Sequence, residues 1–142
     1  MATKRYAHTD WNGDLIHGQG LVTLDSSGAG EYPVTWASRS QEANGKTSPE
    51  ELIGAAHSSC FSMALANSLA EAGTPPTRLK TRAEVTLQPG KGITDIVLSV
   101  EGSVPGLDES AFIAAAEDAK LNCPVSQALA GTSITLRATL AQ

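Results

Sequence analysis

The feature that most constrains the fold is a long, almost uncharged helix in the middle of the chain. In the run Ser48-Pro49-Glu50-Glu51 the serine is a good N-cap, the proline suits the first helical position, and the second glutamate completes a capping box. Residues 52–69 are apolar or small almost all round, so this helix belongs inside the fold. We expect it to end near Ala72, because Gly73 can adopt the left-handed conformation and Pro75-Pro76 cannot continue a helix.

Strands with one buried and one exposed face follow the helix. Apolar and polar residues alternate with a period of two in residues 79–88, 95–101 and 133–140, which predicts three strands. The turn residues 89–92 join the first two of these strands into a hairpin. Residues 4–38 are glycine-rich with short β-like runs, and we interpret them as a small antiparallel meander.

Two further helices complete the predicted elements. One begins after Asp108, a good N-cap, and runs to about Leu121, and a short one follows Cys123-Pro124. The chain has 142 residues, of which 41% are hydrophobic, enough for one compact core. The pattern therefore predicts an α+β fold in a single domain over residues 1–142.

Charge and composition argue against several classes of partner. The formal net charge is -5, from 15 acidic and 10 basic residues, and no Lys/Arg cluster could follow a phosphate backbone, so we expect no nucleic acid partner. The N-terminus lacks the apolar core of a secretory signal, and no stretch approaches the ~20 apolar residues that cross a bilayer. We therefore expect a cytoplasmic protein with no membrane partner.

The two cysteines of the chain stand in different electrostatic settings. Cys60 lies in the middle of the apolar helix, where burial should raise the pKa of a thiol, so it is a core thiol unless a cation reaches it from elsewhere in the fold. Cys123 precedes Pro124 at the N-cap of a short helix, a position that stabilises a thiolate. Cys123 could equally be a cap whose dipole has no functional consequence.

Three other residues are candidates for chemistry. Arg39 follows a strand ending near Trp36 and opens the loop of residues 40–47, where it could serve a site or be an ordinary loop arginine. Glu50 is a first-turn carboxylate, which the helix dipole favours in any case. His57 lies three residues before Cys60 and could activate it, although a hydrogen-bonded core histidine is the simpler interpretation. The spacing of cysteines and histidines does not support a zinc site.

Two long motifs resemble those of a known family. Residues 48–65, SPEELIGAAHSSCFSMAL, and residues 123–129, CPVSQAL, closely resemble the OsmC/Ohr family of osmotically inducible and organic hydroperoxide resistance proteins. The resemblance implies an OsmC-like α+β fold in which antiparallel sheets enclose two main helices, as an intertwined homodimer without a cofactor. It also implies a thiol-dependent peroxidase that reduces organic hydroperoxides and, less well, hydrogen peroxide in stress defence.

The resemblance also implies roles for four residues. Cys60 would be the peroxidatic cysteine, oxidised to a sulfenic acid, and Cys123 the resolving cysteine that condenses with it to form a disulfide. Arg39 would stabilise the Cys60 thiolate, and Glu50 would orient the arginine. The osmotically inducible branch places its arginine as Arg39 does, whereas the other branch takes one from the N-terminal region, where Trp11-Asn12-Gly13-Asp14-Leu15 offers none. Dihydrolipoyl groups on partner proteins are the reductant that the family suggests.

Helix geometry adds an inference about subunits. Ten residues separate Glu50 from Cys60, so on one continuous helix they lie about 15 Å apart along the axis, beyond side-chain cooperation. If both serve one site, they come from different subunits, with two copies of the helix crossing antiparallel near Ala55. Gly54 and Ala56 are small enough to allow such a close approach.

Two other functions fit the same residues. One is a non-redox acyl-transfer enzyme that uses Cys60 and His57, and the other is a non-catalytic dimer that binds an apolar ligand and whose thiols are core packing. Counting free thiols before and after one equivalent of cumene hydroperoxide separates them. A peroxidase loses both thiols, whereas the two alternatives predict little loss.

Overall fold

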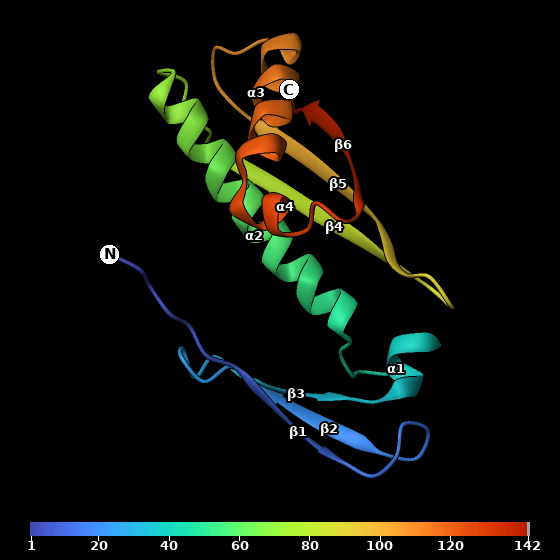
Figure 1. Cartoon of the computed structure of the whole chain (residues 1–142). Helices are drawn as coiled ribbons and strands as arrows, with labels where there is room; N and C mark the ends of the chain where they lie inside the picture. The colour runs from blue at the N-terminus through green and yellow to red at the C-terminus, as the bar shows by residue number, and fades with distance from the viewer. Residues whose placement is uncertain (142) are drawn as a thin grey trace. The chain divides into compact units, whose positions relative to one another are not determined.

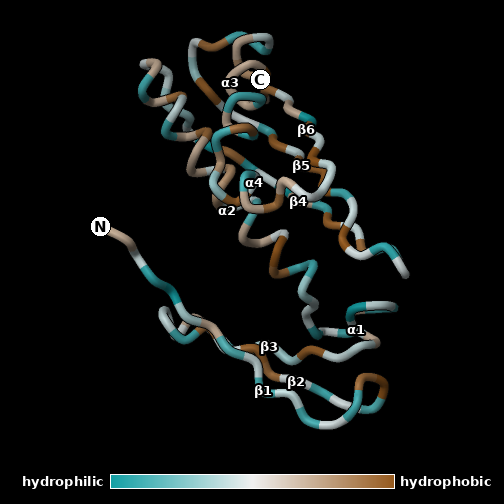
Figure 2. Tube along the Cα trace, viewed as in Figure 1, coloured by the Kyte–Doolittle hydropathy of each residue, from teal (hydrophilic) through white to brown (hydrophobic). Residues whose placement is uncertain are grey.

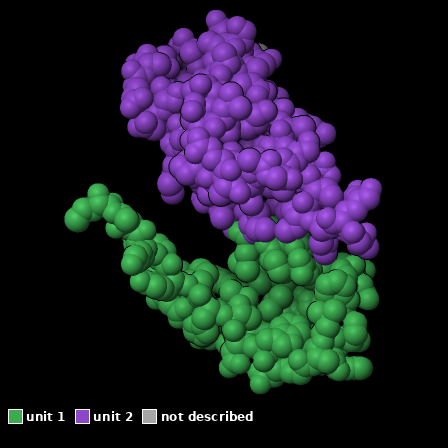
Figure 3. Space-filling view, viewed as in Figure 1, with its two compact units in different colours: residues 1–52 green, residues 53–142 purple. Residues whose placement is uncertain are grey.

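A computed structural model describes residues 1–141, and Gln142 lies outside the described residues. The chain divides into two compact units, residues 1–52 and residues 53–142 (Figure 3). Within residues 1–141, none of the helices combines the length and the apolar character needed to cross a membrane.

The first unit is an antiparallel meander followed by a short helix (Figure 1). Strands β1 (His8–Asn12), β2 (Gln19–Thr23) and β3 (Glu31–Val34) pair antiparallel in the order β1-β2-β3, which confirms the predicted meander. The expectation that β3 continues to Trp36 is wrong. Helix α1 (Trp36–Ser40) begins there instead, so Arg39 lies in a helical turn and does not open a loop.

The early end of β3 has a local cause in a capping box that opens α1. The hydroxyl of Thr35 accepts a hydrogen bond from the backbone N–H of Ser38 at 3.0 Å, and the Ser38 hydroxyl accepts one from the backbone N–H of Thr35 at 3.0 Å. These two reciprocal bonds satisfy the backbone N–H groups of Thr35 and Ser38, so these groups are not available for pairing with a neighbouring strand.

Helix α2 (Pro49–Glu71) confirms the long helix predicted from the sequence. The Ser48 hydroxyl accepts from the backbone N–H of Glu51 at 3.1 Å, as predicted. The Glu51 carboxylate, expected to close the capping box, instead accepts from the Thr47 hydroxyl at 2.7 Å. Gly73 has φ of +85°, the left-handed conformation predicted after the last turn.

The second unit contains a mixed sheet. Strands β4 (Arg78–Gln88), β5 (Gly92–Ser103) and β6 (Ser133–Leu140) lie in the order β4-β5-β6. The β4–β5 hairpin is antiparallel as predicted, but β6 pairs with β5 in parallel, so the expectation of antiparallel sheets holds only for the first unit. Helices α3 (Glu109–Asn122) and α4 (Pro124–Ala128) form the crossover that a parallel pair requires.

The core of the second unit lies between this sheet and the helices. The buried residues Ile96, Leu98 and Val100 alternate along β5, so they point to one face of the sheet, and this face packs against α2 and α3. Figure 2 colours this part of β5 as largely hydrophobic. A Cβ atom at Gly102 would overlap the Phe112 ring, so β5 and α3 are in close contact there. The buried hydrophobic residues of these elements are Phe61, Leu65, Leu69, Ile96, Leu98, Val100, Phe112, Ala116 and Ala119.

The expectation that α2 is buried all round is met on one face only. Gly54, His57 and Phe61 are buried, whereas Ala55 and Met63 are exposed, the methionine at 71%. Gly54 faces the backbone of β4 within the same chain, where its missing side chain allows close packing. The exposed residues of α2 in the second unit include Ala55, Ala56, Ser59 and Met63.

Candidate functional site

The two cysteines, distant in sequence, come together in the second unit. Cys60 on α2 and Cys123 between α3 and α4 are both free thiols, and each influences the ionisation of the other. Cys123 is completely buried, with 0% exposure, whereas Cys60 is only partly buried. The sequence predicted a buried Cys60, and in the structure Cys123 is the more deeply buried of the two thiols.

Cys123 owes its position to the junction of two helices. It is the C-cap of α3, where its backbone N–H donates to the Ala119 carbonyl at 2.8 Å. It is also the N-cap of α4, where its carbonyl accepts from the Gln127 N–H at 3.0 Å. Pro124 starts α4, as the sequence predicted. The sulfur makes no regular N-cap hydrogen bond, but it lies beside the first backbone N–H groups of α4.

The surroundings shift the two thiols in opposite directions. Burial raises the pKa of Cys60, the backbone N–H of Val125 opposes this, and Cys123 adds to the increase. Burial also acts to raise the pKa of Cys123, but the N–H and hydroxyl of Ser126, together with Cys60 and Val125, hold that pKa below its ordinary value. Within this unit the Cys123 thiol therefore loses its proton more readily than the Cys60 thiol.

His57 is a buried core histidine, as the simpler interpretation predicted. Its side chain has 0% exposure, and its Nε2 lies 2.7 Å from the Ser126 hydroxyl oxygen. Burial lowers the pKa of His57, so the imidazole is neutral near pH 7. Nε2 is thus engaged with Ser126, a residue that the sequence analysis did not single out and whose only signal was its place three residues after Cys123.

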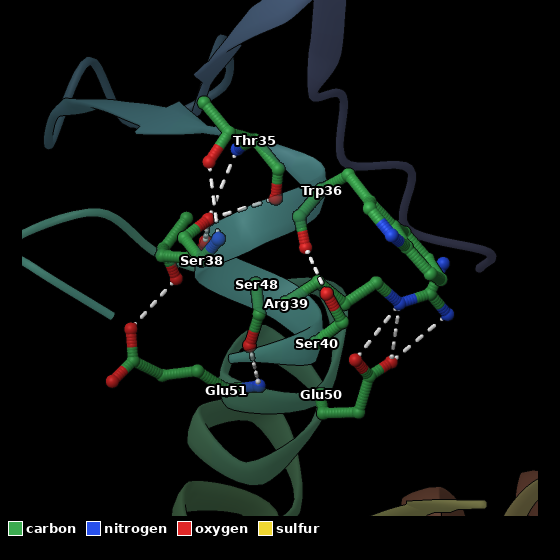
Figure 4. Close-up of polar contacts among 9 residues, drawn as sticks. Thr35, Trp36, Ser38, Arg39, Ser40, Ser48, Glu50 and Glu51 are labelled. Atoms are coloured by element: carbon green, nitrogen blue, oxygen red, sulfur yellow. Dashed lines mark hydrogen bonds and ion pairs between the residues drawn. The ribbon is translucent and has the colours of Figure 1, made fainter. Parts of the chain in front are cut away.

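The other two predicted site residues form an ion pair in the first unit (Figure 4). The Arg39 Nε donates to both oxygens of Glu50, at 2.9 and 3.2 Å, and Nη2 donates to Oε2 at 3.0 Å. The side chain of Arg39 is 31% exposed and that of Glu50 is 9% exposed. This bidentate geometry fixes the plane of the guanidinium.

Short-range contacts hold α1 so that Arg39 meets Glu50. The Ser38 hydroxyl donates to the Thr47 carbonyl at 2.8 Å, and the Thr47 N–H donates to the Pro33 carbonyl at 2.9 Å. Thr47, the residue before the capping Ser48 of α2, therefore connects α1 and β3 to the start of α2. Arg39 is held by its neighbours and does not lie on a free loop.

Arg39 also borders an apolar cavity of the first unit. The cavity has a volume of about 330 Å³, and Arg39 is the charged residue in its lining. The remaining lining residues are Thr9, Trp11, Leu15, Val22, Val34, Thr35, Trp36, Pro49 and Leu52.

The four predicted site residues thus form two pairs, Cys60 with Cys123 in the second unit and Arg39 with Glu50 in the first. Among the described residues, no group of three or more histidine, cysteine, aspartate or glutamate side chains is arranged to hold a metal ion. The fold and the two neighbouring free thiols define an α+β protein whose candidate site contains a pair of cysteines.

Comparison with known proteins identifies the family. The model of the OsmC-like protein family matches residues 42–138. The chain is 43% identical over 132 residues to peroxiredoxin OsmC of Escherichia coli strain K12, an alignment that covers 91% of this chain and 92% of that protein. Peroxiredoxin OsmC of Shigella flexneri matches equally well. The chain belongs to the OsmC-like family.

Solved structures agree on the fold. An OsmC-like protein from Mycoplasma pneumoniae superposes with a TM-score of 0.74 at 18% identity, covering 100% of both chains. The organic hydroperoxide resistance protein OsmC from Legionella pneumophila superposes with a TM-score of 0.68 at 19% identity, covering 99% of this chain and 100% of that one. At these identities the likeness concerns the fold alone.

Proposed function

We propose that this chain is a thiol-dependent peroxidase that reduces organic hydroperoxides, and more weakly hydrogen peroxide, in defence against oxidative and osmotic stress. The observation that carries the proposal is the pairing of Cys60 with Cys123, two free thiols on separate elements that influence each other's ionisation. The 43% identity to a peroxiredoxin over nearly the whole chain supports the same class of activity.

The catalytic cycle has two chemical steps. The Cys60 thiolate attacks the terminal oxygen of the hydroperoxide and breaks the O–O bond, which leaves a sulfenic acid on Cys60 and releases an alkoxide that is protonated to the alcohol. The Cys123 sulfur then attacks the Cys60 sulfur, forms the disulfide and releases water. Cys60 is thus the peroxidatic residue and Cys123 the resolving residue.

The first step requires a cation near Cys60, because burial raises the pKa of this thiol. None of the influences on the Cys60 pKa within the described residues comes from a cation. Arg39, oriented by Glu50, is the group we assign to this task. A guanidinium beside the sulfur would stabilise the thiolate and the developing alkoxide.

We further propose that Arg39 and Glu50 act on the Cys60 of a second subunit in an intertwined homodimer. Helix α2 is continuous, so Glu50 and the Cys60 of the same chain lie about 15 Å apart along its axis. The exposed alanines Ala55 and Ala56 would allow α2 to pack closely against a second copy of this helix, and the exposed Met63 would add apolar contact area.

The cavity beside Arg39 accounts for a preference for organic substrates. Its lining is largely apolar and its volume is about 330 Å³, which suits the hydrocarbon part of a hydroperoxide. Arg39 at the wall would place its guanidinium near the peroxide group. Hydrogen peroxide leaves this apolar surface unused, so it should be the poorer substrate.

The disulfide must be reduced to complete the cycle. We propose a thiol reductant for this step, in particular a dihydrolipoyl group on a partner protein. A cytoplasmic location follows from the same reasoning, because that compartment keeps catalytic disulfides transient. The proposed reaction requires no cofactor or metal.

Thiol counting tests the proposal directly. The reduced protein is titrated with a chromogenic disulfide reagent before and after one equivalent of cumene hydroperoxide. The proposal predicts loss of both thiols of each chain and release of cumyl alcohol. Retention of both thiols would favour the acyl-transfer or ligand-binding alternatives, although the engagement of His57 with Ser126 already disfavours a Cys60–His57 acyl-transfer pair.

A further inference from the structure

A buried hydroxyl and a buried imidazole lie beside the resolving thiol, and the proposed peroxidase cycle does not use them. Ser126 and His57 are 69 residues apart in sequence, yet Ser126 Oγ and His57 Nε2 are 2.7 Å apart in the interior. Ser126 is 6% exposed and His57 is 0% exposed. Ser126 follows Cys123, the N-cap of α4, by three residues, and its hydroxyl is among the groups that lower the pKa of Cys123.

We propose that Ser126 and His57 are positioning residues for disulfide formation: the imidazole orients the Ser126 hydroxyl so that it donates to the Cys123 sulfur, which is thereby held as the attacking thiolate. This inference rests on the proposed peroxidase function. It assigns to His57 a role toward Cys123, reached through Ser126, and not the role of a base for Cys60.

Proton counting supports this direction. A serine hydroxyl has one proton, so if it donates to the Cys123 sulfur, its oxygen must accept from His57, whose Nε2 then carries the proton. A neutral imidazole protonated at Nε2 has a bare Nδ1. The Nδ1 of His57 is buried and has no hydrogen-bond partner among residues 1–141. In the opposite tautomer Nδ1 would carry the proton, and this buried N–H donor would have no acceptor. The tautomer protonated at Nε2 avoids that cost.

Few other groups near Cys123 could stabilise its thiolate. Its hydrophobic cluster contributes apolar side chains from α2, β5 and α3, including Phe61, Leu98 and Phe112. The groups that act on its pKa are Cys60, the N–H and hydroxyl of Ser126, and the backbone of Val125, and Cys60 is the titratable side chain among them. His57 stays neutral and acts only by orienting the hydroxyl.

The resolving step balances without an added reactant. The Cys123 thiolate attacks the sulfur of the Cys60 sulfenic acid, the S–S bond forms and the S–O bond breaks. The Cys123 sulfur is oxidised and the Cys60 sulfur is reduced. The oxygen leaves as hydroxide and takes a proton from solvent to give water, which matches the proton that Cys123 had released earlier. The Ser126 hydroxyl keeps its own proton throughout.

The test compares Ser126→Ala with Ser126→Thr, because threonine keeps the hydroxyl. Ser126→Ala should slow disulfide formation after a hydroperoxide pulse by about tenfold or more, the loss expected for a hydrogen bond to a charged group, and the sulfenic acid should be trapped by dimedone in proportion. Ser126→Thr should restore most of the rate. His57→Gln, which keeps an N–H near the Nε2 position, should be less impaired than His57→Leu.

A pH profile separates positioning from a loss of packing. In a Cys60→Ser background, the ultraviolet absorbance of the Cys123 thiolate should titrate at higher pH when Ser126→Ala is added and return toward the original pH with Ser126→Thr. The inference is overturned if the alanine variant leaves the titration and the rate of disulfide formation unchanged, or if alanine and threonine impair both equally.

A separate readout distinguishes failure of this inference from failure of the proposed function. The Cys123→Ser protein, treated with one equivalent of cumene hydroperoxide, should form a Cys60 sulfenic acid that dimedone captures. If no sulfenic acid forms, the peroxidase proposal itself fails. If it forms and the Ser126 variants behave as the unaltered chain does, only the positioning role is lost.

Discussion

The two units each contain one pair of site residues, and the pairs differ in kind. In the first unit Arg39 and Glu50 are a bidentate ion pair with distances of 2.9 to 3.2 Å. In the second unit Cys60 and Cys123 are thiols in a hydrophobic cluster, and hydrogen bonds alone favour the thiolate on Cys123. One unit thus contains a paired cation, and the other contains the two thiols that we propose as nucleophiles. Peroxide reduction at Cys60 needs both, which is why we propose that the first unit of one subunit serves the second unit of another.

The largest effect should come from removing the nucleophile. Cys60→Ser should abolish hydroperoxide turnover, a loss on the order of a thousandfold or more, because no other group forms the sulfenic acid. Cys123→Ser should instead allow a single oxidation that stops at the sulfenic acid. Stopped-flow peroxide consumption, with dimedone trapping, measures both. If Cys123→Ser abolished the first oxidation while Cys60→Ser still allowed it, Cys123 would be the peroxidatic cysteine, the role that its lowered pKa would suggest.

The next effect should come from the cation. Arg39→Ala should slow the first oxidation by about a hundredfold, comparable to the removal of one electrostatic stabiliser of a transition state. Arg39→Lys should be intermediate, because lysine keeps the charge but not the two-pronged geometry toward Glu50. The pH dependence of the single-turnover rate is the measurement, and its midpoint should move to higher pH in the alanine variant. An unchanged rate would mean that the ion pair of the first unit is only structural.

A packing change should affect stability in the second unit alone. Gly102→Ala places a methyl group against the Phe112 ring and should lower the free energy of unfolding by about 1 to 3 kcal/mol. Gly131→Ala is the matched control, because nothing lies near its missing side chain. Urea denaturation compares them, and equal stability of the two variants would contradict the close contact between β5 and α3.

The smallest effect concerns pH and His57. Burial lowers the pKa of His57 below 6.5, so below pH 6.5 the unfolded chain binds more protons and the free energy of unfolding decreases as the pH falls. The stabilisation is fully present above pH 6.5 and is lost as the pH falls through the lowered value. The His8 pKa is raised by its hydrogen bond to Asp25, which gives the opposite dependence. Denaturation midpoints of the original chain and of His57→Gln across this range isolate the His57 contribution, since His8 is common to both.

Local signals in the sequence were enough to predict most elements. The Ser48-Pro49 start, the Gly73 stop and the period-two strands all depend on nearest neighbours, and the structure confirms them. The parallel pairing of β5 with β6 depends on where the α3–α4 crossover returns the chain, which no local pattern encodes. The short helix that contains Arg39 was not predicted, because Val34 and Thr35 are β-branched residues that are typical of strands. The capping box that Thr35 forms with Ser38 begins at the second of these residues.

The site was predictable only in part for a related reason. The resemblance to a family selected Cys60, Cys123, Arg39 and Glu50, and the structure places them in two pairs, while their roles remain predictions. Ser126 lies inside the motif of residues 123–129, but nothing local singled it out, because its contact with His57 spans 69 residues. The complete burial of Cys123 also depends on long-range packing, which its N-cap position in the sequence does not encode.

The measurement that tests the central claim most directly uses mixed dimers. A chain carrying Cys60→Ser, with Arg39 intact, is co-expressed with a differently tagged chain carrying Arg39→Ala, with Cys60 intact, and the heterodimer is isolated. If Arg39 serves the Cys60 of the partner subunit, one complete site forms in each heterodimer, so about half the activity of the unaltered symmetric dimer should return. If the heterodimer is as inactive as the two parent variants, Arg39 does not act across subunits and the proposed division of the site is wrong.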